Sequence, residues 1–125
     1  MPCSVTGEGL ADVAVIVASE AAAAAGRANP KSSSFAPDFV SWVSRFWTVR
    51  SSGGCLDAMM VASGCAEAWI EPVALPWDLA PLKIIAEEAG CVTFDFAGND
   101  TIYGGNFVIT APAFADELRE FVSRK

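Results

Sequence analysis

The sequence predicts a single α/β layered domain over residues 1–125, with a mixed or mostly parallel sheet whose faces are covered by helices. Short apolar segments typical of strands alternate along the chain with amphipathic segments typical of helices. Hydrophobic residues make up 53% of the chain and charged residues 18%, a balance that fits a sheet buried on both faces or an uncovered interface. The sequence contains no internal repeat and no linker that would divide its 125 residues, so one core is expected.

The first third of the chain predicts one strand, one loop and one helix. Residues 13–18 form a continuous apolar run rich in β-branched side chains, as expected of an interior strand. Residues 21–25 continue as helix or turn, and residues 26–34, rich in Gly, Asn, Pro and Ser, predict an exposed loop. Pro37 suits the start of a helix. The apolar stripe of that helix consists of Phe39, Val43 and Phe46.

The middle of the chain predicts two short strands around a helix. Residues 47–49 suit a strand and residues 50–54 a turn. Residues 55–63 predict a helix that ends at Gly64, because glycine readily adopts the left-handed conformation that follows a helix. Residues 68–70 predict the second strand.

The last third of the chain predicts two helices and two strands. Asp78 is expected at the N-cap of a helix whose apolar face contains Leu82, Ile85 and Ala89 and which Gly90 ends. Strands are expected at residues 91–96 and 106–110, with a turn at 97–100. Pro112 is expected to open the last helix. Its apolar face is expected to contain Phe114, Leu118, Phe121 and Val122.

Charge and hydropathy make two classes of partner unexpected. The net charge is −7 with only eight Lys and Arg, so the chain lacks the basic face of a nucleic-acid binder. No apolar run approaches the roughly 18 residues of a membrane span. The N-terminus shows no basic region before an apolar stretch, so no signal peptide is expected and a cytoplasmic location is the default.

The cysteine and histidine content argues against certain metal sites and catalytic mechanisms. Four cysteines occur without a Cys-x-x-Cys pair and there is no histidine, which argues against structural zinc. The absence of histidine also excludes mechanisms with a histidine base. We interpret the cysteines as small buried apolar residues.

Three segments carry a resemblance to a known family. They are Arg50-Ser-Ser-Gly-Gly-Cys-Leu-Asp-Ala-Met-Met-Val-Ala-Ser-Gly64, the stretch 71–90 with Trp77-Asp78-x-Ala80 and Glu88-Ala-Gly90, and Gly104-Gly-Asn106 followed by Pro112. Together with the strand expected at residues 13–18, they resemble the C-terminal half of the Mg²⁺-dependent inositol monophosphatase and histidinol-phosphatase family, over nearly the whole chain. The eleven-residue step from Gly53 to Gly64 is more similar to the histidinol-phosphatase branch.

The resemblance implies roles for four residues. Asp78 corresponds to a ligand of catalytic Mg²⁺, an ion that takes hard oxygen ligands; its alternative role is a helix cap. Glu71 corresponds to a contact with substrate hydroxyl or amine groups, and its alternative is a solvated glutamate at a strand end. Arg50 and Gly54 correspond to the loop that faces the substrate. Arg50 is open to three interpretations: a contact to phosphate, a contact to an anionic partner, or a surface arginine.

The sequence also departs from the family. The family's upstream glutamate and its Asp-Pro-x-Asp-Gly-Thr loop hold the metals and the attacking water, and the chain has neither an Asp-Pro nor an Asp-Gly step. Gly54 stands where the histidinol-phosphatase branch has aspartate, and Cys91 where the family has a second glycine. Because one carboxylate cannot replace a two-metal centre, we expect this chain alone to bind no Mg²⁺ and to catalyse no hydrolysis.

Three functions remain open on the sequence. The chain could be half of a phosphatase completed by an N-terminal half supplied in trans, a self-associating module without catalysis, or a binder of a small polar ligand near Glu71 and Asp78. The second is favoured for the chain in isolation, because exposed apolar surface is usually covered by association. The expected assembly is a homodimer, or a larger closed assembly, formed through the face that an N-terminal half would cover, with Trp69 and Trp77 as candidate anchors.

Overall fold

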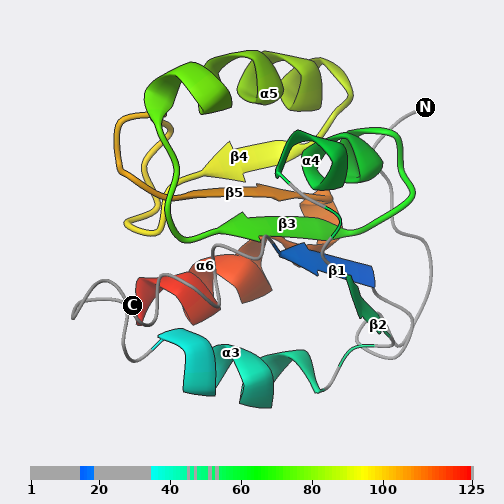
Figure 1. Ribbon diagram of the computed structural model, residues 1–125, viewed down its shortest axis with the longest axis vertical. Coiled ribbons are helices and arrows are strands. Elements are labelled where there is room, and N and C mark those ends of the chain that lie inside the picture. Colours follow the sequence, from blue (N-terminus) through cyan, green and yellow to red (C-terminus); the bar gives the residue numbers. More distant parts are fainter. Residues whose placement is uncertain are drawn as a thin grey trace.

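The structure is a computed structural model that describes residues 15–18, 35–44, 46, 48–50, 52 and 54–124. Figure 1 shows how the elements are arranged. In chain order the strands and helices are β1 (Val15–Ala18), α3 (Phe35–Val43), β2 (Thr48–Arg50), α4 (Gly54–Ala62), β3 (Ala68–Glu71), α5 (Pro76–Glu88), β4 (Val92–Phe94), β5 (Phe107–Thr110), the 3₁₀ turn η2 (Pro112–Phe114) and α6 (Ala115–Ser123). Within this part of the chain, no helix is long and apolar enough to cross a membrane.

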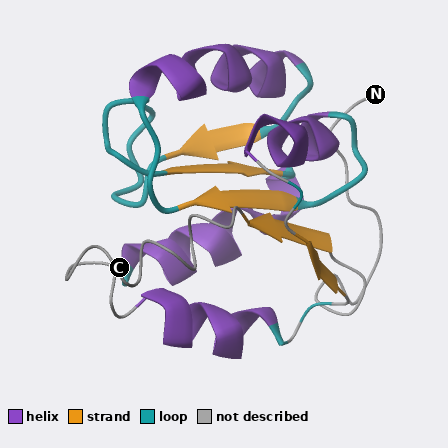
Figure 2. Ribbon diagram, viewed as in Figure 1, coloured by secondary structure: helices purple, strands orange, loops and turns teal. Residues whose placement is uncertain are grey.

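The sheet is mixed and lies between two layers of helices. Its strand order is β2-β1-β3-β5-β4. β1 pairs in parallel with β2 and β3, whereas β5 pairs antiparallel with β3 and β4. Helices α4 and α5 cover one face, and α3 and α6 cover the other (Figures 1 and 2). The predicted α/β layered fold is therefore confirmed.

Alternation along the central strands divides the core into two clusters. In β3, Ile70 packs with the cluster on the α3 and α6 side, whereas Trp69 packs with the cluster on the α4 and α5 side. In β5, Val108 belongs to the first cluster and Ile109 to the second. Successive strand residues point to opposite faces of the sheet. Because β3 and β5 are buried on both faces, they consist mainly of apolar residues.

Most predicted elements are present with shifted boundaries. The first strand is described from Val15, and residues 13–14 lie outside the described part. The expectations for residues 21–25 and 26–34 also lie outside it. Pro37 lies inside α3, which starts at Phe35. The last helix is preceded by the 3₁₀ turn η2, and its predicted apolar face is buried.

Two expectations for helix α5 were wrong. The N-cap is Leu75, with Pro76 at the first helical position, so Asp78 lies inside the first turn and does not cap the helix. The buried face consists of Leu79, Leu82 and Ala86. Ile85 is 47% exposed. Both the expected and the observed faces contain Leu82 at helical spacing, so periodicity could not choose between them.

The cysteine interpretation holds only in part, and one tryptophan lies in the core. Cys91 is buried, whereas Cys55 and Cys65 are exposed free thiols, contrary to the expectation; Cys3 lies outside the described residues. Trp69 is 2% exposed within the core. It is therefore not available as an interface anchor.

A small polar network ties α5 to β4 and the turn that follows β4. Lys83 Nζ lies 2.8 Å from Asp100 Oδ1 and also pairs with Glu87. The Thr93 hydroxyl donates to Glu87 Oε1 over 2.9 Å. The hydrogen bonds that Lys83 donates to the carboxylates of Asp100 and Glu87 raise the pKa of Lys83 above its usual value, and the bond to Glu87 lowers the pKa of that carboxylate.

Candidate functional site

The four site residues predicted from the sequence lie at the ends of strands or helices, near one edge of the sheet. β2 ends at Arg50 and β3 ends at Glu71. Both strands run parallel to β1, so their carboxyl ends lie at the same edge. Gly54 begins α4, and Asp78 lies in the first turn of α5. In open α/β sheets, ligands bind at the carboxyl ends of parallel strands.

A cavity of about 270 Å³ lies at this edge and contains three of the four predicted residues. Its walls come from α4, β3, α5 and the loop between β3 and α5. The lining residues are Gly54, Cys55, Trp69, Glu71, Val73, Ala74, Asp78, Leu79 and Leu82. Arg50 is not among them; the structure describes its backbone in β2 but not its side chain.

Glu71 is a buried carboxylate in the wall of the cavity. Glu71 is 6% exposed, so the alternative interpretation as a solvated glutamate at a strand end is wrong. The backbone N–H of Val73 donates to Glu71 Oε1 over 3.4 Å. A carboxylate in the wall of a cavity can accept hydrogen bonds from the polar groups of a ligand.

Asp78 presents a second carboxylate at the rim of the same cavity. It is exposed and lies in the first turn of α5, where a negative charge is stabilised by the helix dipole. The first residue of α4, Gly54, lies in the same wall, and an added Cβ there would meet no atom within 4 Å. The Gly54 side of the cavity is therefore open to a ligand or to a larger side chain.

Two backbone contacts hold the loops that form the cavity. The buried carboxylate of Asp57 accepts the backbone N–H of Ser52 at 3.0 Å and 3.3 Å, which fixes the turn before α4. The Ala74 N–H donates to the carbonyl of Gly105 over 2.9 Å, so the loop before β5 supports the loop after β3. No sequence motif indicated either contact.

The sequence reasoning also missed two lining residues, Cys55 and Trp69. Trp69 precedes Glu71 by two positions on β3, so strand alternation places both side chains on the same face of the sheet. Cys55 follows Gly54 in the first turn of α4. Adjacency to Gly54 and Glu71 was therefore the signal that could have identified both.

The acidic residues of the site fit a shared Mg²⁺ site rather than a complete one. The described residues include no group of three or more His, Cys, Asp or Glu side chains arranged to hold a metal ion. Two carboxylates, Glu71 and Asp78, line one cavity. Mg²⁺ is usually held by one or two carboxylates together with waters and substrate phosphate oxygens, so this donor set can contribute to a Mg²⁺ site that other groups complete.

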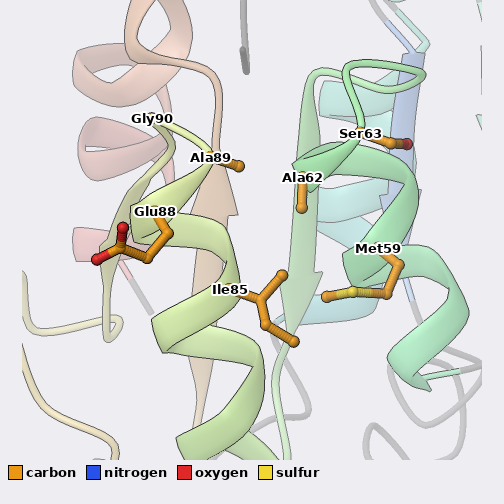
Figure 3. Close-up of a pocket in the computed structure, with 7 residues that line it drawn as sticks. All are labelled: Met59, Ala62, Ser63, Ile85, Glu88, Ala89 and Gly90. Carbon is orange, nitrogen blue, oxygen red and sulfur yellow. The ribbon is translucent and has the colours of Figure 1, made fainter. Parts of the chain in front are cut away.

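A larger hollow of about 750 Å³ lies elsewhere, between the C-terminal ends of α4 and α5 (Figure 3). Its lining residues are Met59, Ala62, Ser63, Ile85, Glu88, Ala89 and Gly90. Glu88 is the one ionisable side chain among them, and in Figure 3 its carboxylate points away from Met59. Chemistry requires converging polar groups, so the smaller cavity is the better candidate.

Comparison with known proteins relates nearly the whole chain to one family. A sequence profile of the inositol monophosphatase family matches residues 2–123. A histidinol-phosphatase of Chlorobaculum parvum is 41% identical over 63 residues, which are 50% of this chain and 24% of that protein. A histidinol-phosphatase of Mycobacterium tuberculosis is 34% identical over 80 residues, or 64% of this chain and 31% of that protein. The chain thus spans less than a third of these curated relatives.

Solved structures show the same fold. An inositol monophosphatase from Anabaena superimposes with a TM-score of 0.77 at 22% identity, covering 97% of this chain and 49% of that one. SuhB of Mycobacterium tuberculosis superimposes with a TM-score of 0.70 at 28% identity, covering 95% and 44% respectively. Together with the profile match over nearly all 125 residues, these similarities show that the chain belongs to the inositol monophosphatase family.

Proposed function

We propose that these 125 residues form the substrate-contacting and metal-contacting half of a Mg²⁺-dependent phosphomonoesterase, completed by a second half-site that another segment supplies. The observation that carries the proposal is the single cavity lined by Gly54, Glu71 and Asp78, three residues that the family resemblance assigns to substrate and metal. The substrate class is a phosphate monoester of a small polyol or amino alcohol.

Each residue has a distinct role in this proposal. Glu71 accepts hydrogen bonds from hydroxyl or amine groups of the substrate, and Gly54 leaves room beside it. Asp78 contributes a carboxylate oxygen to Mg²⁺. When bound, the metal would polarise the phosphoryl oxygens and neutralise their developing charge. Asp78 lies exposed at the rim, where a complementary half-site can approach it.

These residues are not sufficient for catalysis. The sequence lacks the Asp-Pro-x-Asp-Gly-Thr loop that holds metals and water in the family. We therefore expect the isolated chain to release no phosphate above background from histidinol phosphate or inositol 1-phosphate with millimolar Mg²⁺. Release by the isolated chain that Asp78→Asn abolishes would overturn the half-site proposal.

The isolated chain is not expected to hold Mg²⁺ stably, so weak metal contact is tested with Mn²⁺, a paramagnetic substitute that broadens nearby signals even when it is bound only briefly; carboxylates suit both ions. In the presence of inorganic phosphate, Mn²⁺ should broaden the backbone amide signals of Glu71 and Asp78 before others, and Asp78→Asn should remove the effect. Asp116→Asn is the matched control, because Asp116 is also an exposed first-turn aspartate, in α6. Broadening that persists in Asp78→Asn would contradict the assignment.

Catalytic completion is tested by adding the other half. The chain is mixed with the part of the Chlorobaculum parvum histidinol-phosphatase that this chain does not match, and phosphate release is followed with Mg²⁺. The proposal expects activity in the mixture that neither part shows, and its loss in Asp78→Asn and reduction in Glu71→Gln. Equal activity with and without this chain would count against the proposal.

Self-association is a second role, favoured by the outer face of α5. Trp77 is 71% and Ile84 63% exposed, and helical spacing places the exposed Pro81 between them. These three residues form an apolar stripe opposite the buried face of the helix. Burial at roughly 25 cal/mol per Å² favours covering such a stripe, and a homodimer with two-fold symmetry is the commonest closed assembly.

The association is tested by sedimentation equilibrium at micromolar concentration. The unmodified chain should sediment as a dimer, and Trp77→Glu or Ile84→Glu should shift it toward the 13.1 kDa monomer. Tyr103→Glu is the control, because Tyr103 is 78% exposed in a loop outside the stripe. A monomer for the unmodified chain over the whole concentration range would rule the role out.

A further inference from the structure

A buried carboxylate in α4 holds the chain just ahead of that helix. Asp57 is 0% exposed, and Gly54, where α4 begins, precedes it by three positions. The Asp57 carboxylate accepts the backbone N–H of Ser52, with Oδ1 at 3.0 Å and Oδ2 at 3.3 Å. Because Ser52 is exposed and Asp57 is buried, this hydrogen bond anchors a surface segment to the interior of the protein.

The anchored segment leads into the wall of the cavity of about 270 Å³. Gly54 opens α4 and lines this cavity, whereas Glu71 and Asp78 line it from β3 and α5. Ser52 lies two positions before Gly54, so movement of its backbone is passed to that side of the wall. The width of the cavity between Gly54 and Glu71 therefore depends on a contact made outside it, because Asp57 is not among the lining residues.

We infer that Asp57 is a positioning residue of the ligand site: through Ser52 it holds the start of α4 at the distance from Glu71 that the ligand requires. The inference rests on the proposed function of the cavity as the substrate-contacting site. It gives a role to a residue that the family resemblance left without one and that does not itself contact the ligand.

The effect on binding follows from the freedom that the hydrogen bond removes. Without the Asp57 carboxylate, water can take over the exposed Ser52 N–H, and the segment ahead of α4 gains conformational freedom. A ligand that contacts both Gly54 and Glu71 must then order this segment again, and fixing one backbone residue weakens binding roughly five- to thirtyfold. The coupling is reciprocal, so an occupied cavity should in turn hold Ser52 more firmly.

The test uses the isolated chain, with histidinol and myo-inositol as probes, because they are the alcohol portions of the proposed substrate class. Binding is followed in ¹⁵N spectra through the backbone amide signals of Gly54 and Glu71, at a temperature at which every variant is folded by circular dichroism. The unmodified chain should bind at least one of the two probes, and the bound probe should slow the hydrogen exchange of the Ser52 amide.

Two substitutions of Asp57 separate positioning from stability. Asp57→Ala removes both acceptor oxygens and should weaken probe binding roughly five- to thirtyfold. Asp57→Asn keeps one acceptor oxygen for the Ser52 N–H and should recover most of that affinity, although both variants lose stability. Val122→Ala is the matched control, because Val122 is 1% exposed in the core cluster on the opposite face of the sheet. It should lower stability and leave probe binding unchanged.

Three results would overturn the inference. If Glu71→Gln abolishes probe binding but Asp57→Ala binds as tightly as the unmodified chain, the cavity is the ligand site and the role of Asp57 is wrong. If Val122→Ala weakens binding as much as Asp57→Ala does, affinity only follows stability and the role is again wrong. If the unmodified chain binds neither probe, both the role of Asp57 and the proposed function of the cavity are wrong.

The exchange measurement decides the question if Asp57→Ala does not fold. Slower exchange of the Ser52 amide in the unmodified chain when the probe is bound supports the coupling between this segment and the cavity. Exchange that is unchanged by a bound probe overturns it.

Discussion

The turn before α4 should depend on one buried carboxylate, which makes Asp57→Asn an informative substitution. Asp57 is 0% exposed and accepts the Ser52 N–H at 3.0 Å and 3.3 Å. Asparagine keeps the shape but removes the charge and replaces one acceptor oxygen with a donor. The hydrogen-bonded turn leads directly into Gly54 and Cys55, two residues of the cavity wall.

The cost can be worked out from these contacts. A hydrogen bond to a charged group contributes about 1.5–3 kcal/mol, and a negative charge in a first helical turn adds about 0.3–1 kcal/mol. The lower cost of burying a neutral amide offsets part of this loss, which leaves a destabilisation of about 1–3 kcal/mol. An unfolding entropy of about 2.1 cal/mol/K per residue gives about 4 °C per kcal/mol for a chain of this length. The melting temperature should therefore fall by roughly 4–12 °C.

The assay is thermal unfolding followed by far-UV circular dichroism, with Asp116→Asn as the matched control. Asp116 is also a first-turn aspartate, but it is exposed and pairs only loosely with Arg119 at 3.4 Å, so its substitution should change the melting temperature little. An Asp57→Asn melting temperature equal to or above that of the unmodified chain would refute the reasoning. It would mean that the free-energy cost of burying the carboxylate is at least as large as the stabilisation from its hydrogen bonds.

Two further substitutions test contacts away from the cavity wall. Gly104→Ala should destabilise the chain in urea unfolding, because a Cβ there would lie 2.9 Å from Asp95 Cβ. Gly54→Ala is the control and should not destabilise the chain, because the space around Gly54 is open. Equal effects of the two substitutions would contradict the steric explanation. Glu87→Gln should lower stability slightly at pH 7. Because the folded-state pKa of Glu87 lies below its usual 4.5, this difference should be present above pH 4.5 and vanish as the pH falls further. It should be small and shrink with added salt, since Glu87 is largely exposed. A difference that persists at pH 2 would show another cause.

Local sequence patterns were sufficient to predict the elements that have only one way to bury their apolar side chains. The face of α6, with Leu118 and Phe121 at helical spacing, is buried as predicted. Residues 15–18 of the predicted strand at 13–18 and residues 107–110 of the predicted strand at 106–110 form β1 and β5. Turning α6 about its axis would expose large apolar side chains, and strands that are apolar on both faces suit only the interior of a layered sheet.

Helix α5 shows where periodicity was not sufficient. Its sequence carries apolar residues on two opposite sides, one through Leu79, Leu82 and Ala86 and another through Trp77 and Ile84. Only packing against α4, β4 and β5 decides which side is buried. The same limit applies to Cys55 and Cys65, because a small apolar residue fits an exposed helix end as well as a core.

The sequence by itself determined the layered fold, the family motifs and the identity of the residues assigned to substrate and metal. Only the tertiary structure decided that Gly54, Glu71 and Asp78 line one cavity, that Glu71 is buried there, and that Trp69 belongs to its wall. The physical reason is that strand and helix patterns record which face of an element is apolar, through local spacing. A cavity is instead formed by the ends of separate elements, and their relative positions depend on packing between residues distant in the sequence.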